Sequence, residues 1–207
     1  MLPKDLINKY RDWKESSFAQ EKDHFERLAK EGQSPKYMII SCVDSRVDPN
    51  AMFQTKAGEM LVHRNIANLV PPYEYLTEHS GTIATIEFGI TALNIKNIVI
   101  LGHSGCGGIK NGYHLCKDDK LDENTSIANW LKLLLPAYKK LSDQNDKDAI
   151  GSLEKISIIT SIDNLKSYPF IKRGIETNEI KIFGLWNDIG SANIHAYNSK
   201  TNAFEII

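Results

Sequence analysis

Tyr37-Met-Ile-Ile-Ser-Cys42, together with the similar stretch Asn97-Ile-Val-Ile-Leu-Gly102, decides the fold class of this chain. Both stretches are short, continuous apolar runs rich in branched residues, which is typical of parallel strands that are covered on both faces. Leu61-Val62 indicates a strand between them, and Ile180-Lys-Ile-Phe-Gly184 indicates one after them. Because helical patterns alternate with these runs, we expect an α/β fold with a mainly parallel central sheet flanked by helices.

The helical patterns come from apolar residues that recur at helical spacing. The clearest stretches are residues 1–30, 82–93 and 127–141. Pro136 predicts a kink in the last of these, and residues 158–165 favour a further helix that ends near Tyr168-Pro169. Residues 156–160 also fit a strand, so both interpretations of this region stay open. Residues 197–206 are typical of a terminal antiparallel hairpin.

Length and composition predict one globular domain. The chain has 207 residues, of which 42% are hydrophobic and 25% charged, and this is enough for one well-buried core. No linker or internal repeat divides the sequence. We therefore expect a single domain over 1–207, made of an N-terminal helical arm over 1–32 and an α/β core over 33–207.

Charge and cysteine content narrow the class of partner and the compartment. The 25 Lys and Arg residues nearly balance the 26 Asp and Glu residues, which removes the usual electrostatic case for nucleic acid or an anionic membrane as a partner. No apolar run approaches the roughly 18 residues of a membrane span, and the first residues show no signal-peptide pattern. Three cysteines argue against a disulfide framework, so we expect a cytoplasmic protein.

Chemically reactive side chains follow both of the deciding strands. Cys42-Val-Asp44-Ser-Arg46 comes at the end of the first strand, and His103-Ser-Gly-Cys106-Gly-Gly108 comes after the second. Open parallel sheets bind ligands at the carboxyl ends of their strands, so the two segments can meet there. Two thiolates and one imidazole suit Zn2+, with a fourth position left for water or substrate. We therefore predict that Cys42, His103 and Cys106 hold a zinc ion that activates a water molecule.

Other functions of the same residues fit less well. A phosphate-binding loop fails because the residues after Gly107 are not the Lys and the Ser or Thr that this motif requires. A loop like that of tyrosine phosphatases fails because too few residues separate Cys42 from Arg46. A disulfide between Cys42 and Cys106 remains possible in principle, although it would leave His103 without a role.

Several motifs occur in the order that characterises one known family. They are Gln33-Ser-Pro-Lys36, Cys42-Val-Asp-Ser-Arg-Val47, Val62-His-Arg-Asn-Ile-Ala-Asn-Leu-Val70, His79-Ser-Gly-Thr82, Gly102-His-Ser-Gly-Cys-Gly-Gly-Ile109 and Asn164-Leu-Lys-Ser-Tyr-Pro-Phe170. Through them the chain resembles the β-class carbonic anhydrases. The resemblance implies reversible hydration of carbon dioxide to bicarbonate, with one Zn2+ per chain on the three ligands. It also implies a homodimer, or a larger oligomer built of dimers, in which the N-terminal helices embrace the partner subunit.

The same resemblance implies roles for further residues. Asp44, held by Arg46, would accept a hydrogen bond from the zinc hydroxide. If the ion pair with Arg46 breaks, Asp44 could instead bind zinc as the fourth ligand, which gives a closed form of the site. The residues that match the substrate pocket are Gln33, Leu61, Ile66, Phe88 and Gly102. Two of them depart from the plant-like pattern, because Leu61 stands in place of Phe and Phe88 in place of Tyr. Ile39 stands where bicarbonate-inhibited members have Trp, so we do not expect that inhibitory site.

Two alternative functions stay open at this point. One is a related zinc hydrolase that acts on carbon disulfide or carbonyl sulfide, and the other is a non-catalytic bicarbonate-binding module. Three zinc ligands with an open fourth position argue against the module, because a purely structural zinc prefers four ligands. His63 and His79 lie in matching motifs, and we expect both to be structural.

Overall fold

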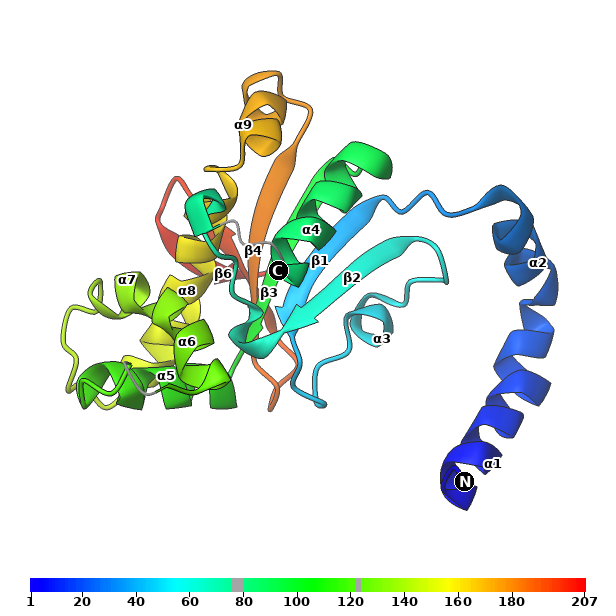
Figure 1. The fold of residues 1–207 in the computed structure, drawn as a ribbon, viewed down its shortest axis with the longest axis horizontal. Coiled ribbons are helices and arrows are strands. Elements are labelled where there is room, and N and C mark those ends of the chain that lie inside the picture. The colour runs from blue at the N-terminus through cyan, green and yellow to red at the C-terminus, as the bar shows by residue number, and fades with distance from the viewer. Residues whose placement is uncertain (76–79, 122–123) are drawn as a thin grey trace.

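One central sheet organises the computed structural model, which describes residues 1–75, 80–121 and 124–207 (Figure 1). Its strand order is β2-β1-β3-β4-β5-β6. The strands are β1 (Tyr37–Cys42), β2 (Met60–Asn65), β3 (Asn97–His103), β4 (Lys181–Asn187), β5 (Ile194–Asn198) and β6 (Ala203–Ile206). The first four pair in parallel, and β5 and β6 continue the sheet in antiparallel pairing. The predicted α/β class, with its mainly parallel sheet and terminal hairpin, is confirmed.

The two central strands, β1 and β3, carry the core on both of their faces. On one face, Met38 and Ile40 pair in register with Ile98 and Ile100, and all four belong to the main core. The smaller cluster on the other face consists of Ile39, Val47, Val99 and Leu101. Side chains alternate along a strand, so Cys42 at the end of β1 lies on the same face as Met38 and Ile40.

Helices pack against the sheet and cover the main core. α4 (Gly81–Glu87) continues as a π-helical turn (Phe88–Ala92), and it shares the main core with α8 (Ala149–Leu165). The other helical segments after the arm are α3 (Pro49–Phe53), α5 (Gly107–Lys117), α6 (Ser126–Leu131), α7 (Leu135–Tyr138), α9 (Pro169–Glu176) and 3₁₀ turns at Ile66–Asn68, Tyr73–Tyr75 and Lys132–Leu134. Among the described residues, no helix is both long enough and apolar enough to cross a membrane.

Two helical regions differ from the expectations. Residues 156–160 lie inside α8, so the alternative of a strand is wrong. Apolar residues occur on several sides of α8, and periodicity does not separate a largely buried helix from a strand. The stretch 127–141 divides into α6, a 3₁₀ turn and α7. Pro136 lies in the first turn of α7, a position that needs no backbone N–H.

The N-terminal arm extends away from the sheet, on the side opposite to α5–α7 (Figure 1). It consists of α1 (Lys4–Trp13), a π-helical turn (Lys14–Phe18) and α2 (Lys22–Glu31), and none of the described residues in these segments is buried. The rings of Trp13 and Phe18 pack together with their centroids 5.4 Å apart. Near its end the arm contacts its own core, where His24 Nε2 lies 2.8 Å from the carbonyl oxygen of Ala57.

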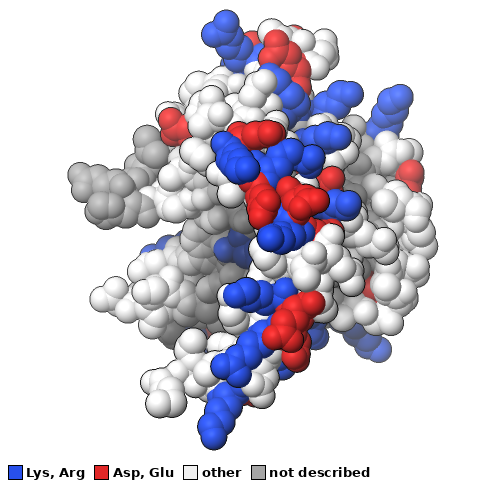
Figure 2. Space-filling model, turned by 90° about the vertical axis from the view of Figure 1, so that its right-hand side faces the viewer, with Lys and Arg blue, Asp and Glu red and all other residues white. Residues whose placement is uncertain are grey.

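Charges of both signs alternate on the surface where the arm lies. Figure 2 shows Lys and Arg side chains next to Asp and Glu side chains down the middle of this view. The chain has a net charge of −1 at pH 7, and on this side charges of opposite sign lie next to each other. Neighbouring charges of opposite sign largely cancel one another's field on this side.

Candidate metal centre

Cys42, His103 and Cys106 meet at the carboxyl ends of two neighbouring strands. Cys42 is the last residue of β1, His103 is the last residue of β3, and Cys106 immediately precedes α5 as its N-cap. Their sulfur and ring nitrogen atoms all lie within 4.8 Å of one another, and all three residues are buried. The structure thus brings together the three residues that were singled out as zinc ligands, although Cys42 and Cys106 are 64 positions apart.

The two sulfurs are free thiols, not a disulfide. Cys42 Sγ and Cys106 Sγ lie 3.8 Å apart, which is hydrogen-bonding distance for sulfur. The hydrogen bond with Cys106 lowers the pKa of Cys42 to about 4, against the opposing effect of burial. The same hydrogen bond, together with burial, raises the pKa of the Cys106 thiol. The hydrogen bond therefore makes Cys42 easier to ionise than an ordinary cysteine, and a buried thiolate favours a cation beside it.

The His103 ring is oriented so that one nitrogen is left for a ligand. Nδ1 lies 3.0 Å from the carbonyl oxygen of Ser104, to which it donates. Nε2 is buried and has no hydrogen-bond partner among the described residues. A buried polar atom without a partner is costly and rare, and a metal-binding histidine usually donates its other N–H to a carbonyl in this way. The donor set and the unpartnered nitrogen therefore fit a zinc ion.

Asp44 and Arg46 form a paired group at the rim of the cluster. Arg46 donates from Nε to Asp44 Oδ1 at 2.9 Å and from Nη2 to Oδ2 at 2.8 Å, so both carboxylate oxygens are held. This Arg46 guanidinium keeps the pKa of Asp44 well below its usual range. Asp44 Oδ2 lies 3.9 Å from His103 Nε2, which places an ionised acceptor next to the proposed metal position.

Arg64 holds the loop that carries Cys42 and Asp44. Its Nε donates to the carbonyl oxygen of Cys42 at 2.9 Å, and its Nη2 donates to those of Asp44 at 2.6 Å and Val47 at 2.8 Å. The guanidinium therefore fixes three backbone carbonyls with one rigid group. Sequence reasoning missed this role, because nothing in the local sequence shows that an arginine of β2 reaches the end of β1.

The 3₁₀ turn Ile66–Asn68 lies against the start of α5. Ala67 has a φ of 64° and Asn68 a φ of 48°, and both residues are buried. A side chain at Gly108 would place its Cβ 2.7 Å from Cγ2 of Ile66, so only glycine allows α5 to begin this close to the turn. Trp130 Nε1 donates to the carbonyl oxygen of Ile66 at 2.8 Å. These contacts hold the turn Ile66–Asn68 and the start of α5, which follows Cys106, against each other.

The residues that match a substrate pocket differ in how deeply the single chain buries them. Gly102 is buried next to His103, and a Cβ there would lie 2.7 Å from Cδ1 of Ile158. Ile66 contacts the start of α5, as described above, and Leu61 is partly buried against the main core. Gln33 is exposed in the segment before β1, and Phe88 is 49% exposed.

Two further residues near the site, His63 and Glu154, make hydrogen bonds within the chain. His63 Nε2 lies 2.9 Å from Thr82 Oγ1, which fits the structural role that we expected for it. His79 lies outside the described residues. Sequence reasoning did not notice Glu154, whose carboxylate is buried and accepts the backbone N–H of Cys106. An acidic residue among the apolar residues of α8 was the available signal.

A buried Cys-His-Cys cluster at the end of a parallel sheet, with an ionised acceptor beside it, is the arrangement of a metal-dependent α/β enzyme. The family described as carbonic anhydrase matches residues 37–194. Beta carbonic anhydrase 3 of Arabidopsis thaliana is 36% identical over 85% of this chain and 69% of that protein. A carbonic anhydrase of Helicobacter pylori strain J99 is 36% identical over 95% of this chain and 90% of that protein.

Solved structures agree with these relatives. The β-carbonic anhydrase CcaA superposes with a TM-score of 0.90 at 29% identity, covering 99% of this chain and 98% of that one. A tetrameric β-carbonic anhydrase of Sordaria macrospora gives a TM-score of 0.76 at 27% identity, covering 92% and 94%. The chain therefore belongs to the carbonic anhydrase family, in its β class.

Proposed function

We propose that this chain catalyses the zinc-dependent, reversible hydration of carbon dioxide to bicarbonate and a proton, with one Zn2+ per chain. The observation that carries the proposal is the buried cluster of Cys42, His103 and Cys106, whose ligand atoms lie within 4.8 Å of one another. The Nε2 atom of His103 supports it, because this atom is buried without a hydrogen-bond partner in the part of the chain that the structure describes. When bound, zinc supplies a hydroxide nucleophile near neutral pH by lowering the pKa of water to about 7 in the best-known case.

Asp44 orients the nucleophile in this proposal. Because Arg46 holds Asp44 ionised, its carboxylate accepts hydrogen bonds but donates none. Oδ2 would accept the proton of the attacking hydroxide as a hydrogen bond, so that the lone pair on oxygen faces carbon dioxide. If the pair with Arg46 opened, Asp44 could take the fourth ligand position itself and close the site.

The apolar part of the site would exclude water around carbon dioxide. We assign this role to Leu61, Ile66 and Phe88, with Gly102 leaving room beside His103. Gln33 would donate a hydrogen bond from its amide to a substrate oxygen. Gln33 and Phe88 are exposed in the single chain, so we infer that a second copy completes the pocket.

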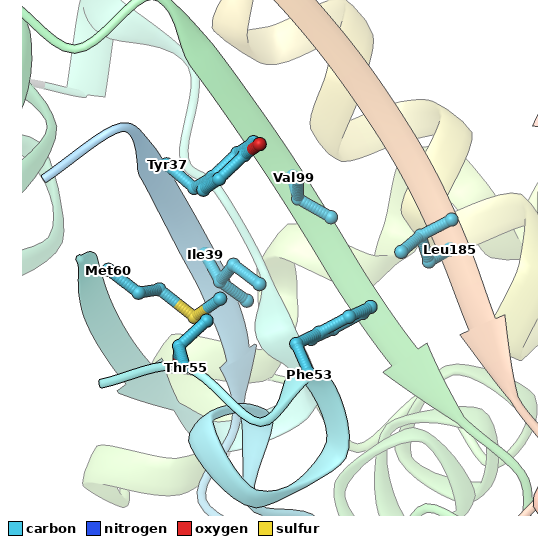
Figure 3. A pocket seen from close by; sticks show the side chains of 7 residues that line it. All are labelled: Tyr37, Ile39, Phe53, Thr55, Met60, Val99 and Leu185. Carbon is cyan, nitrogen blue, oxygen red and sulfur yellow. The ribbon is translucent and has the colours of Figure 1, made fainter.

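We infer a homodimer, or an oligomer built of dimers, in which the arm of residues 1–32 packs on the core of residues 33–207 of the partner. The arm has large exposed apolar side chains, such as Tyr10 at 56% and Trp13 at 43%. On the sheet face opposite to the main core there is an apolar cavity of about 340 Å³. Figure 3 shows Tyr37, Ile39, Phe53, Thr55, Met60, Val99 and Leu185 around it. Tyr37 and Phe183, at 43% and 44% exposed, extend this surface.

The cytoplasm suits the cluster as a compartment. Cys42 Sγ and Cys106 Sγ are 3.8 Å apart, and both must stay reduced to bind a metal. Oxidising compartments form and keep disulfides, whereas glutathione and thioredoxin keep cytosolic thiols reduced. We therefore place the enzyme in a reducing compartment.

The proposal is tested by stopped-flow hydration of carbon dioxide with a pH indicator, with metal content measured on the same protein. We expect one zinc per chain and a rate well above that of buffer alone. Zinc-loaded protein that acts only on carbonyl sulfide or carbon disulfide would point to the related hydrolase. Zinc-loaded protein that acts on none of these substrates would point to a binding module.

A further inference from the structure

Glu154 is a buried carboxylate that takes no direct part in the proposed reaction. It lies within α8 and is 3% exposed. Both of its oxygens are used: Oε1 accepts the backbone N–H of Cys106 at 3.0 Å, and Oε2 accepts the indole N–H of Trp186 at 3.1 Å. A carboxylate is expensive to bury, so a buried one that is fully hydrogen-bonded holds its partners in a defined geometry.

The two partners of Glu154 belong to two different segments, the turn that carries Cys106 and the strand β4. Cys106 is one of the proposed ligands and follows Gly105, which has a φ of 64° and permits a sharp turn. Trp186 is on β4, and it pairs in register with Gly102, the residue before His103. The carboxylate therefore links the Cys106 segment to the strand that lies next to the one carrying His103.

The N–H of Cys106 needs such an acceptor. Cys106 is the N-cap of α5, so its own N–H lies outside the hydrogen bonds of that helix. The neighbouring residues, Gly105 and Gly107, have no Cβ to limit the backbone on either side. Arg46 Nη2 donates to the carbonyl oxygen of Gly105 at 3.1 Å, on one side of the Gly105–Cys106 peptide group, and Glu154 holds the N–H on the other side. Loss of the Glu154 acceptor would free the N–H side of this turn, and the Cys106 sulfur would shift with it.

We propose that Glu154 is a positioning residue of the metal site, which sets the place of the Cys106 sulfur relative to Cys42 and His103 by holding the Cys106 N–H. The inference rests on the proposed function, because it concerns the same cluster as a zinc site. It predicts that Glu154 controls zinc affinity although it touches no ligand atom.

The test measures the zinc dissociation constant by competition with a chromophoric chelator in four variants. Glu154→Gln keeps the shape, but its amide has one acceptor oxygen for two N–H donors. We expect zinc to bind about 10–100-fold more weakly, the loss typical for a partner of a metal ligand. Glu154→Asp keeps the carboxyl group but withdraws it by one methylene, and we expect a loss of similar size. Trp186→Phe removes the competing donor and keeps an aromatic ring beside Lys155 and His195, so it should bind zinc nearly as tightly as the original chain.

The decisive variant is the double substitution Glu154→Gln with Trp186→Phe. With the indole N–H removed, the amide oxygen is free to accept from Cys106, so we expect zinc affinity to recover most of the loss. Original affinity in both Glu154→Gln and Glu154→Asp, whatever their melting temperatures, would show that Glu154 only supports the fold. A double variant as weak as Glu154→Gln alone would overturn the positional role as well. If the unaltered chain itself bound no stoichiometric zinc, the proposed function would fail instead.

Discussion

At the carboxyl end of β1, charged side chains are paired within the chain: Arg46 holds Asp44, and Arg64 holds three carbonyls of the same loop. Along the N-terminal arm, none of the described residues is buried, and Trp13 is 43% exposed. The metal centre is thus largely set by one chain, whereas the arm has apolar surface that its own chain leaves uncovered. The two regions should respond to substitution in different ways.

Cys106→Ser is expected to have the largest effect. A serine hydroxyl is a poor ligand for zinc compared with a thiolate, so metal and activity should be lost together. The loss should exceed the roughly 10–100-fold that follows from altering a partner of a ligand. The measurements are zinc per chain and the hydration rate, with Cys116→Ser as the matched control outside the cluster. Full activity with retained zinc in Cys106→Ser would show that the ligands are assigned wrongly.

Asp44→Asn should reduce the hydration rate by about 100-fold while zinc stays bound, because the amide no longer offers an acceptor on both atoms. Stopped-flow rates together with metal analysis check this. A variant that keeps the original rate would remove Asp44 from the mechanism.

The pH profile sharpens the same prediction. Arg46 keeps the pKa of Asp44 below its usual range, so Asp44 is already ionised at pH 5 and stays ionised as the pH rises. Activity should therefore increase with pH only as the zinc water ionises, and two thiolate ligands should place that step on the alkaline side of neutral. We expect Asp44→Asn to lower the whole profile without moving its midpoint. A midpoint that shifts in this variant would contradict the assignment.

Arg64→Lys should have a smaller effect, of about 10-fold on zinc affinity. An ammonium group cannot reach three carbonyls with the geometry of a guanidinium, so the loop after Cys42 should loosen while the fold persists. Chelator competition measures the change, and Arg27→Lys in the arm is the control. Unchanged affinity in Arg64→Lys would show that the loop needs no such clamp.

Trp13→Ser should have the smallest effect on the metal centre and a clear effect on assembly. If Trp13 is buried by a second copy, its loss should weaken the dimer by about 30-fold, the effect of an aromatic anchor worth about 2 kcal/mol. Light scattering over a dilution series measures this, with Lys9→Ser as control, and zinc per chain should stay constant. An unchanged dimer dissociation constant would show that Trp13 does not pack on the partner subunit.

The metal cluster and the sheet could be predicted from the amino-acid sequence for one reason. The strands ending at Cys42 and His103 are continuous apolar runs, and parallel strands bring their carboxyl ends to one edge. The pattern therefore allowed Cys42 and Cys106, 64 positions apart, to meet, and the motifs shared with the β-class carbonic anhydrases singled them out as ligands.

The parts that escaped prediction depend on contacts between distant segments. Arg64 and Glu154 matter because of the backbone groups that they reach, and a single sequence does not show those groups. Residues 156–160 stayed ambiguous because a buried helix lacks the polar face that identifies helical periodicity. The exposure of Gln33 and Phe88 could not be predicted either, because the residues that would surround them in the proposed dimer come from another chain.

The turn of Ala67 and Asn68 limits how far this protein could be stabilised without harm. Two successive residues other than glycine adopt left-handed backbone angles there, at a cost of about 1–2 kcal/mol each. Ala67→Gly would relieve part of that cost. However, the backbone N–H of Ala67 is among the groups that hydrogen-bond to the Cys42 sulfur and lower its pKa. A glycine at this position would make the backbone more flexible and this N–H less well positioned. At this position a substitution that raises thermal stability would therefore lower activity. Selection for heat resistance alone would tend to reduce the activity of the enzyme.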